Sequence, residues 1–164
     1  MNLPLTRTTP PPEAFTRLWS RERERVWRVC VHLSGSRDRA DDLTQEVALR
    51  AHAALGSFQS RSSPSTWLYR IAVNVALRER EKYRPTSGLE EIVERGCADD
   101  DTLNVRLALN RLPDDQRTAL LLSVYEGLTC KEIAAVLEIP LGTVLSRIHR
   151  ARQRLREELS DENM

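Results

Sequence analysis

Residues 129–159 read TCKEIAAVLEIPLGTVLSRIHRARQRLREEL, and this stretch decides the fold of the C-terminal part of the chain. Thr129 and Glu132 have the spacing of a capping box, in which each side chain accepts a hydrogen bond from the other's backbone at a helix start. Pro140 marks a tight turn after this first helix. A second helix over 141–159 then completes a helix-turn-helix.

Apolar residues at helical spacing predict how the two helices pack. Those expected to meet are Ile133, Ala134 and Leu137 of the first helix and Val144, Ile148, Ala151 and Leu155 of the second. The opposite face of the second helix carries the polar residues Thr143, Ser146, Arg147, His149, Arg150 and Gln153. Such a face suits a recognition helix in the major groove, where arginine binds guanine and Ser or Thr binds bases or phosphates. The alternative is a tight helical hairpin with no DNA.

Charge is unevenly distributed along a chain whose net charge is only +1. Residues 13–82 carry +4, residues 83–102 carry −4, and residues 103–164 are neutral. Within 141–156 there are five arginines and no acid. A basic helix of this kind is typical of nucleic-acid binding. The alternative is a solvated face, since 23 Arg against 2 Lys also fits a genomic base composition.

The N-terminal half predicts helices as well, since no sustained period-two alternation indicates a strand. Helical apolar stripes run over 15–33, 39–56 and 67–75, with a polar loop at 57–64 between the last two. A short helix over 103–112 and another that starts at Pro113-Asp114-Asp115 precede the helix-turn-helix. The predicted fold is all-α, with two small helical domains joined by a linker. The predicted parts are a disordered Pro-rich tail (1–12), a helical domain (13–82), an acidic linker (83–102) and the helix-turn-helix domain (103–164).

Several classes of protein are disfavoured. No secretion signal or membrane-length apolar run occurs, so we expect a cytoplasmic protein. The three cysteines, Cys30, Cys97 and Cys130, form no C-x-x-C pair, which argues against a disulfide framework or a zinc site. We expect Cys30 and Cys130 to be packing residues, and we expect no metal or cofactor.

Two other functions are compatible with parts of this pattern. A regulator with a helix-turn-helix and a signal-sensing lobe would bind duplex DNA on its own, although the first lobe has no evident ligand cluster. An enzyme is the weakest reading, because no Gly-rich phosphate loop and no G-x-S-x-G motif is present. Asp41, Asp42 and Glu46 are more simply a polar helical face.

The loop of the first domain, residues 59–65 (QSRSSPS), is flanked by residues that suit unpaired bases. Aromatic rings stack on such bases, arginines attract the backbone, and an asparagine reads a base edge. The residues concerned are Phe58, Trp67, Tyr69 and Asn74, with Arg61 and Arg70 beside them. For Trp67 the spacing alone favours the alternative, a tryptophan of the core.

These motifs together resemble the extracytoplasmic-function (ECF) group of the sigma-70 family. Residues 38–47 (DRADDLTQEV), Phe58 and residues 66–74 (TWLYRIAVN) resemble region two of sigma factors. Leu112-Pro113, Gln116-Arg117, residues 132–134 (EIA) and residues 142–152 (GTVLSRIHRAR) resemble their region four. The motifs occur in family order and cover nearly the whole chain beyond the tail.

The resemblance implies a non-catalytic initiation subunit of bacterial RNA polymerase, with core polymerase, promoter DNA and an anti-sigma factor as partners. It places core-polymerase binding on the helix that contains Asp41, Asp42, Leu43, Gln45 and Glu46. For the melted minus-ten element, the candidates are Phe58, Gln59, Ser60, Arg61, Ser62, Ser63, Trp67, Arg70 and Asn74. For the minus-thirty-five element, combined with the polar face above, they are Thr143, Leu145, Ser146, Arg147, His149 and Arg150.

Three positions depart from the family pattern. Ala48 stands where the family often has Phe, which affects polymerase binding or core packing. Pro64 stands where an aromatic or apolar residue is common. Leu145 stands where a basic or polar residue is common, and we expect it to contact a thymine methyl, so the promoter sequence is not inherited from relatives.

Overall fold

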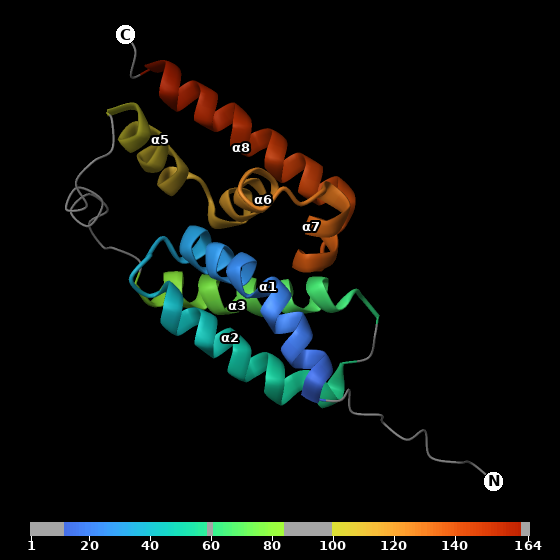
Figure 1. Ribbon diagram of the computed structural model, residues 1–164. Coiled ribbons are helices and arrows are strands. Elements are labelled where there is room, and N and C mark those ends of the chain that lie inside the picture. The colour runs from blue at the N-terminus through green and yellow to red at the C-terminus, as the bar shows by residue number, and fades with distance from the viewer. Residues whose placement is uncertain (1–11, 59–60, 84–99, 162–164) are drawn as a thin grey trace. The chain divides into compact units, whose positions relative to one another are not determined.

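The computed structural model describes residues 12–58, 61–83 and 100–161, and within these residues every regular element is a helix (Figure 1). The expectation of an all-α fold is confirmed. The chain divides into two compact units, one up to Arg80 and the other from Glu81 onward. The expected tail lies outside the described residues except for Pro12, and so does most of the expected linker.

The first unit contains three long helices and one short 3-10 turn. They are α1 (Pro12–Ser34), α2 (Ala40–Ala54), η1 (Leu55–Ser57) and α3 (Pro64–Lys82). Gly35, with φ of 76°, ends α1, and its amide donates to the carbonyl of Val31 at 3.0 Å. Pro64 is the first residue of α3, a position where the missing N–H of proline costs nothing. The departure at Pro64 therefore has a local explanation.

The apolar stripes of α1, α2 and α3 meet in one core. Its most buried large side chains are Val26, Val29 and Leu33 of α1, Val47 of α2 and Leu68 of α3. Cys30 is fully buried among them, and burial raises the pKa of its thiol to about 12. A thiol held protonated in this way is a packing residue, as expected.

The second unit contains α5 (Asp100–Arg111), α6 (Asp114–Val124), α7 (Cys130–Leu137) and α8 (Leu141–Asp161). Helix α5 begins at Asp100, three residues before the helix start expected at Leu103. The acidic residues Asp100 and Asp101 had been assigned to the linker, but acidic residues are also favoured in the first turn of a helix. Helix α6 begins after Pro113, as expected.

The capping box is confirmed. The amide of Glu132 donates to Thr129 Oγ1 at 3.2 Å, and the amide of Thr129 donates to Glu132 Oε2 at 2.8 Å. At the other end of α7, Glu138 adopts the left-handed conformation with φ of 56°. The carbonyl of Pro140 then accepts from the amides of Thr143 and Val144 to start α8.

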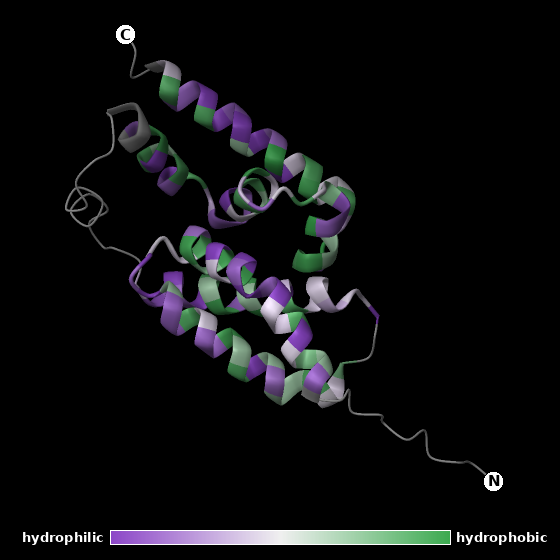
Figure 2. Ribbon diagram, viewed as in Figure 1, coloured by the Kyte–Doolittle hydropathy of each residue, from purple (hydrophilic) through white to green (hydrophobic). Residues whose placement is uncertain are grey.

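The packing of α7 differs from the expected set. Ile133 and Val136 are buried, whereas Ala134 and Leu137 are only half-buried. Val136 lies three residues after Ile133, on the side that faces the core, and this position was overlooked. On α8, by contrast, the expected Val144, Ile148 and Ala151 are buried and Leu155 is half-buried. Figure 2 shows the resulting alternation of polar and apolar bands along α8.

Candidate nucleic-acid and polymerase interfaces

One face of α3 gathers the residues expected to hold unpaired bases. Trp67, Arg70 and Asn74 are separated by three and four residues, which places them on one side of the helix. Asn74 is exposed, and Trp67 and Arg70 are half-buried. Leu68, Ala72, Val75 and Ala76, on the other side, are buried in the bundle. The helix thus presents an aromatic ring, a cation and an amide along one line.

The start of α3 is fixed locally by Ser63. Its Oγ accepts from the amide of Thr66 at 3.1 Å and lies 2.8 Å from Thr66 Oγ1, while its carbonyl accepts from the amide of Trp67. This serine therefore serves as the helix N-cap. Arg61 and Ser63 are exposed and Ser62 is half-buried. Gln59 and Ser60 lie outside the described residues.

Phe58 and Trp67 pack on each other, with ring centroids 5.1 Å apart and planes tilted by 50°. Both line an open groove of about 410 Å³, together with Phe15 and Leu18 of α1. Arg21 stands at the same groove. Trp67 is accordingly neither a buried core residue nor a free surface ring. The groove offers an apolar wall beside a cation.

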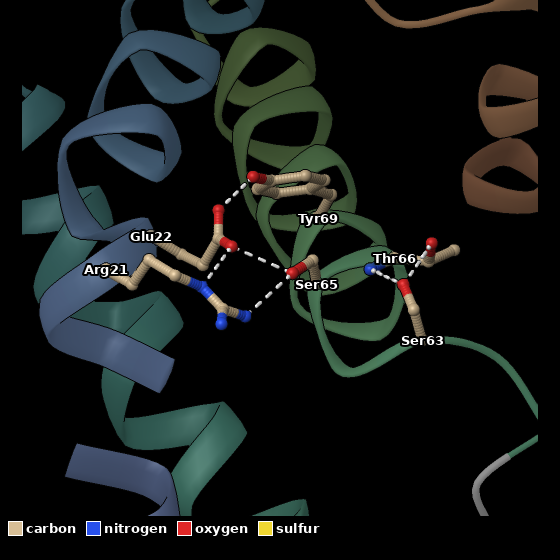
Figure 3. Close-up of polar contacts among 6 residues, drawn as sticks. All are labelled: Arg21, Glu22, Ser63, Ser65, Thr66 and Tyr69. Carbon is tan, nitrogen blue, oxygen red and sulfur yellow. Dashed lines mark hydrogen bonds and ion pairs between the residues drawn. The ribbon is translucent and has the colours of Figure 1, made fainter. Parts of the chain in front are cut away.

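The buried carboxylate of Glu22 on α1 is hydrogen-bonded to side chains near the start of α3 (Figure 3). Glu22 is 7% exposed and accepts hydrogen bonds from Ser65 Oγ at 2.8 Å, from Arg21 Nε at 3.1 Å and from the Tyr69 hydroxyl. Arg25 lies 5.5 Å from the centroid of the Tyr69 ring. These contacts join α1 and α3 through residues that lie 43 and 47 positions apart in the sequence.

The hydrogen bonds decide the charge of this carboxylate. Burial alone raises the pKa of Glu22, but donation from Tyr69, Ser65 and Arg21 outweighs it, so the pKa lies below its usual value. Burial, with the Glu22 charge nearby, raises the pKa of the Tyr69 hydroxyl. Tyr69 was expected among the residues that suit bases, and that expectation is wrong, because its ring is buried and its hydroxyl is bound. Glu22 was missed.

The helix expected to bind polymerase presents most, but not all, of the expected residues. Asp41, Asp42 and Gln45 are exposed on α2, and Glu46 is half-buried in an ion pair with Arg50. Leu43 is buried in the bundle, as the apolar stripe of its helix predicts, so of the five residues it is the one that is not on the surface. Only the family resemblance placed it among the polymerase-binding residues.

The neighbouring face of α1 extends this surface. Trp27 Nε1 donates to Asp41 Oδ1 at 2.9 Å, and the guanidinium of Arg37 lies 5.3 Å from the centroid of the Trp27 ring. An open hollow of about 830 Å³ lies between the two helices, lined by Trp19, Trp27, Asp41 and Ala48, among others. The small side chain of Ala48 leaves this hollow wide.

Helix α8 presents the face expected to read duplex DNA. Leu145 is 52% exposed, His149 and Arg150 are exposed, and Thr143 and Ser146 are half-buried. Arg147 differs from the others, because its Nε lies 3.2 Å from Asp115 Oδ2 on α6. The side opposite the exposed face is the buried stripe that contains Ile148.

The described residues contain no group of three or more His, Cys, Asp or Glu side chains placed to hold a metal ion. None of the described helices combines the length and the hydropathy that crossing a membrane requires.

Both halves of the chain match models of known families. Residues 18–86 match sigma-70 region 2, and residues 102–155 match sigma-70 region 4. The ECF RNA polymerase sigma factor SigW of Bacillus subtilis is 32% identical over 91% of this chain and 90% of its own length. The chain belongs to the ECF group of the sigma-70 family. SigM of Mycobacterium tuberculosis, another ECF sigma factor, is 36% identical over 87% of the chain and 75% of its own length.

Solved structures agree with this assignment. The sigma factor RpoE of Bartonella quintana, in complex with the anti-sigma factor NepR, has a TM-score of 0.68 to this ECF sigma factor at 28% identity, covering 90% of this chain and 98% of its own. CnrH, in complex with the cytosolic domain of CnrY, has a TM-score of 0.73 at 24% identity, covering 94% and 93%, and shares the fold. The sigma-70 family consists of transcription initiation factors.

Proposed function

We propose that this ECF sigma factor binds core RNA polymerase in the cytoplasm and divides a promoter between its units. The first unit binds polymerase and the melted minus-ten element, and the second binds the minus-thirty-five duplex. The observation that carries the proposal is the α3 face of Trp67, Arg70 and Asn74 beside the groove at Phe58. A regulator that binds only duplex DNA has no use for such a face.

Strand opening follows from what this face offers. Melting DNA costs stacking and pairing energy, and a protein that binds flipped bases recovers part of that cost. Each base stacked on an aromatic ring contributes about 1–3 kcal/mol. Trp67 and Phe58 supply rings, Arg61 and Arg70 supply positive charge for the backbone, and Asn74 supplies hydrogen bonds to a base edge. The chain itself carries no catalytic step in this scheme.

Duplex binding rests on α8. Arg150 presents a guanidinium that can bind guanine with two hydrogen bonds, and Leu145 can contact a thymine methyl. Ser146 and His149 lie on the same exposed side. Thr143, at the start of the helix, suits a phosphate. Leu145 stands where the family commonly has a basic or polar residue. The minus-thirty-five sequence that this protein recognises should therefore differ from those of its relatives.

Polymerase binding rests on α2 and the adjoining part of α1. Asp41, Asp42, Gln45 and Glu46 form an acidic and polar surface that suits a basic partner surface. Trp27 fixes the Asp41 carboxylate by its hydrogen bond of 2.9 Å. The hollow at Ala48 leaves room for a bulky side chain of the partner.

The proposal is tested by run-off transcription. The purified chain is mixed with sigma-free core polymerase and genomic DNA of the same organism, and the transcript starts are sequenced. We expect discrete new starts preceded by two elements at a fixed spacing. Asn74→Ala, and the double substitution Ser146→Ala with Arg150→Ala, should abolish them.

Matched control substitutions distinguish a specific loss at the α3 and α8 faces from a general loss of folding. Asn110 and Arg106 are exposed residues of α5, and Asn110→Ala and Arg106→Ala should leave the starts intact. If the chain yields no new starts but binds specific duplexes without polymerase, the regulator is the correct function.

We also propose that an anti-sigma factor restrains this protein. The support is its likeness at 28% identity to a sigma factor solved in complex with one. Affinity purification of the tagged chain from cells before and after stress should recover a protein that inhibits the run-off reaction. Recovery of polymerase alone under every growth condition contradicts this part of the proposal.

A further inference from the structure

Two arginines on α8 have different surroundings although only two residues separate them. Arg150 is exposed. Arg147 places its Nε 3.2 Å from Asp115 Oδ2, and its side chain is 28% exposed. Both were expected to contact DNA on the same grounds, so the ion pair distinguishes them.

The backbone position of Arg147 explains its partner. It lies three residues after Val144 and four before Ala151, both fully buried, so it sits at the edge of the stripe that packs on the domain core. Asp115 is the second residue of α6, a helix that packs against α8. The guanidinium is therefore directed along the junction of the two helices rather than out of the face that carries His149.

We infer that Asp115 withholds Arg147 from the DNA backbone and so sets the sequence-independent part of duplex affinity. The inference rests on the proposed function of α8. The pair is held only partly out of water, since the Asp115 side chain is 48% exposed, and such pairs are weak. A DNA phosphate would have to replace this ion pair to reach the same guanidinium, so Asp115 lowers duplex affinity by a factor of a few.

Releasing Arg147 has a measurable signature. Each phosphate neutralised by a cation adds about 0.9 to the slope of log affinity against log salt. A phosphate contact carries no sequence information. Freeing the side chain should therefore tighten binding to every duplex by the same factor and leave the preference for the promoter unchanged.

The test uses the holoenzyme reconstituted from core polymerase and the full chain. Its affinity is measured from about 50 to 200 mM salt. One probe is a promoter duplex identified from mapped starts, and the other is the same duplex with a scrambled minus-thirty-five element. The variants are Asp115→Asn, Arg147→Ala, both together, and Asp114→Asn. The last is a matched control that removes a charge from the same turn of α6.

We expect Asp115→Asn to tighten both duplexes about threefold to fivefold at the lowest salt and to steepen the slope by about 0.9. Arg147→Ala and Asp114→Asn should each stay within about twofold of wild type. In the Arg147→Ala background, Asp115→Asn should have no effect.

Three results overturn the inference. Weaker binding by Asp115→Asn means that the carboxylate orients Arg147 toward DNA. Equal tightening with and without Arg147 means that only the bulk charge matters. Tightening of the promoter duplex alone means that Arg147 reads a base. If wild type does not prefer the promoter duplex, the proposed function fails, and the variants measured on the scrambled duplex still decide the role of Asp115.

Discussion

The two helices proposed to face DNA both pack on their units through apolar stripes, but they differ in the polar contacts that supplement this packing. Helix α3 gains buried contacts with distant segments, with Glu22 hydrogen-bonded to Ser65 and Tyr69 and Glu79 paired with Arg39 at the start of α2. On α8 the ion pair of Arg147 with Asp115 is partly exposed, and the turn before the helix is shaped by the left-handed Glu138.

The difference fits the two tasks proposed for these helices. A base taken out of the helix must meet an aromatic ring and hydrogen-bonding groups at fixed positions, so the first turn of α3 has to be placed accurately. Buried polar contacts are directional and fix such a placement. A helix that lies in the major groove needs mainly to be straight and exposed on one side. An apolar stripe supplies that, because hydrophobic contact is not directional.

The largest effect that would sharpen this comparison is expected from Glu22→Ala. It leaves the buried Tyr69 hydroxyl without its acceptor, and hydrogen bonds to charged groups contribute about 1.5–3 kcal/mol each. We expect the unfolding free energy of the first unit to fall by about 2–3 kcal/mol. All three tryptophans, Trp19, Trp27 and Trp67, belong to this unit, so tryptophan fluorescence during urea unfolding reports on it alone.

Glu24→Ala is the matched control for that measurement. Its side chain is 87% exposed and pairs with Arg28 at 3.4 Å across one helical turn. Surface pairs of this kind contribute at most about 0.5 kcal/mol. Equal losses for Glu22→Ala and Glu24→Ala would remove the special role of the buried carboxylate.

A second effect concerns pH. The pKa of Glu22 is lowered in the folded protein, so its carboxylate stabilises the fold above the unfolded value of 4.5 and loses that contribution as the pH falls through the folded pKa. The stability difference between wild type and Glu22→Gln should therefore be full at neutral pH and shrink below about pH 4.5. Unfolding curves by fluorescence at several pH values measure it. A difference that is constant with pH contradicts the assignment.

An intermediate effect is expected in the second unit from Thr129→Ala, which removes the N-cap of α7. Loss of such a cap costs about 1 kcal/mol. Hydrogen exchange of the α7 amides should accelerate about fivefold, while the tryptophan signal of the first unit stays unchanged. Glu132→Gln keeps the capping geometry and serves as the control. A slowed or unaltered exchange in Thr129→Ala would show that tertiary packing alone holds α7.

The smallest effect is expected from Glu138→Gly, and it has the opposite sign. A non-glycine residue in the left-handed region costs about 1 kcal/mol, which glycine relieves. We expect the second unit to gain about 0.5–1 kcal/mol, measured by circular dichroism during thermal unfolding. Glu157→Gly makes the same chemical change inside α8, where glycine destabilises by a similar amount. Loss of stability in both variants would mean that Glu138 contributes more through its own contacts than its backbone costs.

Local features were predictable from the sequence. Gly35, Pro113 and the pair Thr129 and Glu132 act within one helical turn, so a few neighbouring letters contain the whole cause. The buried stripe of α8 follows from a period of 3.6 residues in the same way. The start of α5 was predicted three residues late, because periodicity locates helix ends poorly.

Contacts between distant segments were not predictable. Glu22 lies among charged neighbours on α1 and looks like a surface residue until Ser65 and Tyr69 approach it from α3. No sequence pattern near Arg147 predicts its ion pair with Asp115, which lies thirty-two residues earlier. Val136 was overlooked because the exact side of a short helix that faces the core is set by its tertiary neighbours.

The arrangement of α8 also bears on how such proteins diversify. Val144, Ile148 and Ala151 carry the folding of the helix, whereas Leu145, His149 and Arg150 are exposed between them. Exposed side chains away from caps and core change stability little when they are replaced. If α8 reads duplex DNA as proposed, a lineage can therefore exchange the three exposed residues and acquire a new set of target genes while the domain keeps its stability.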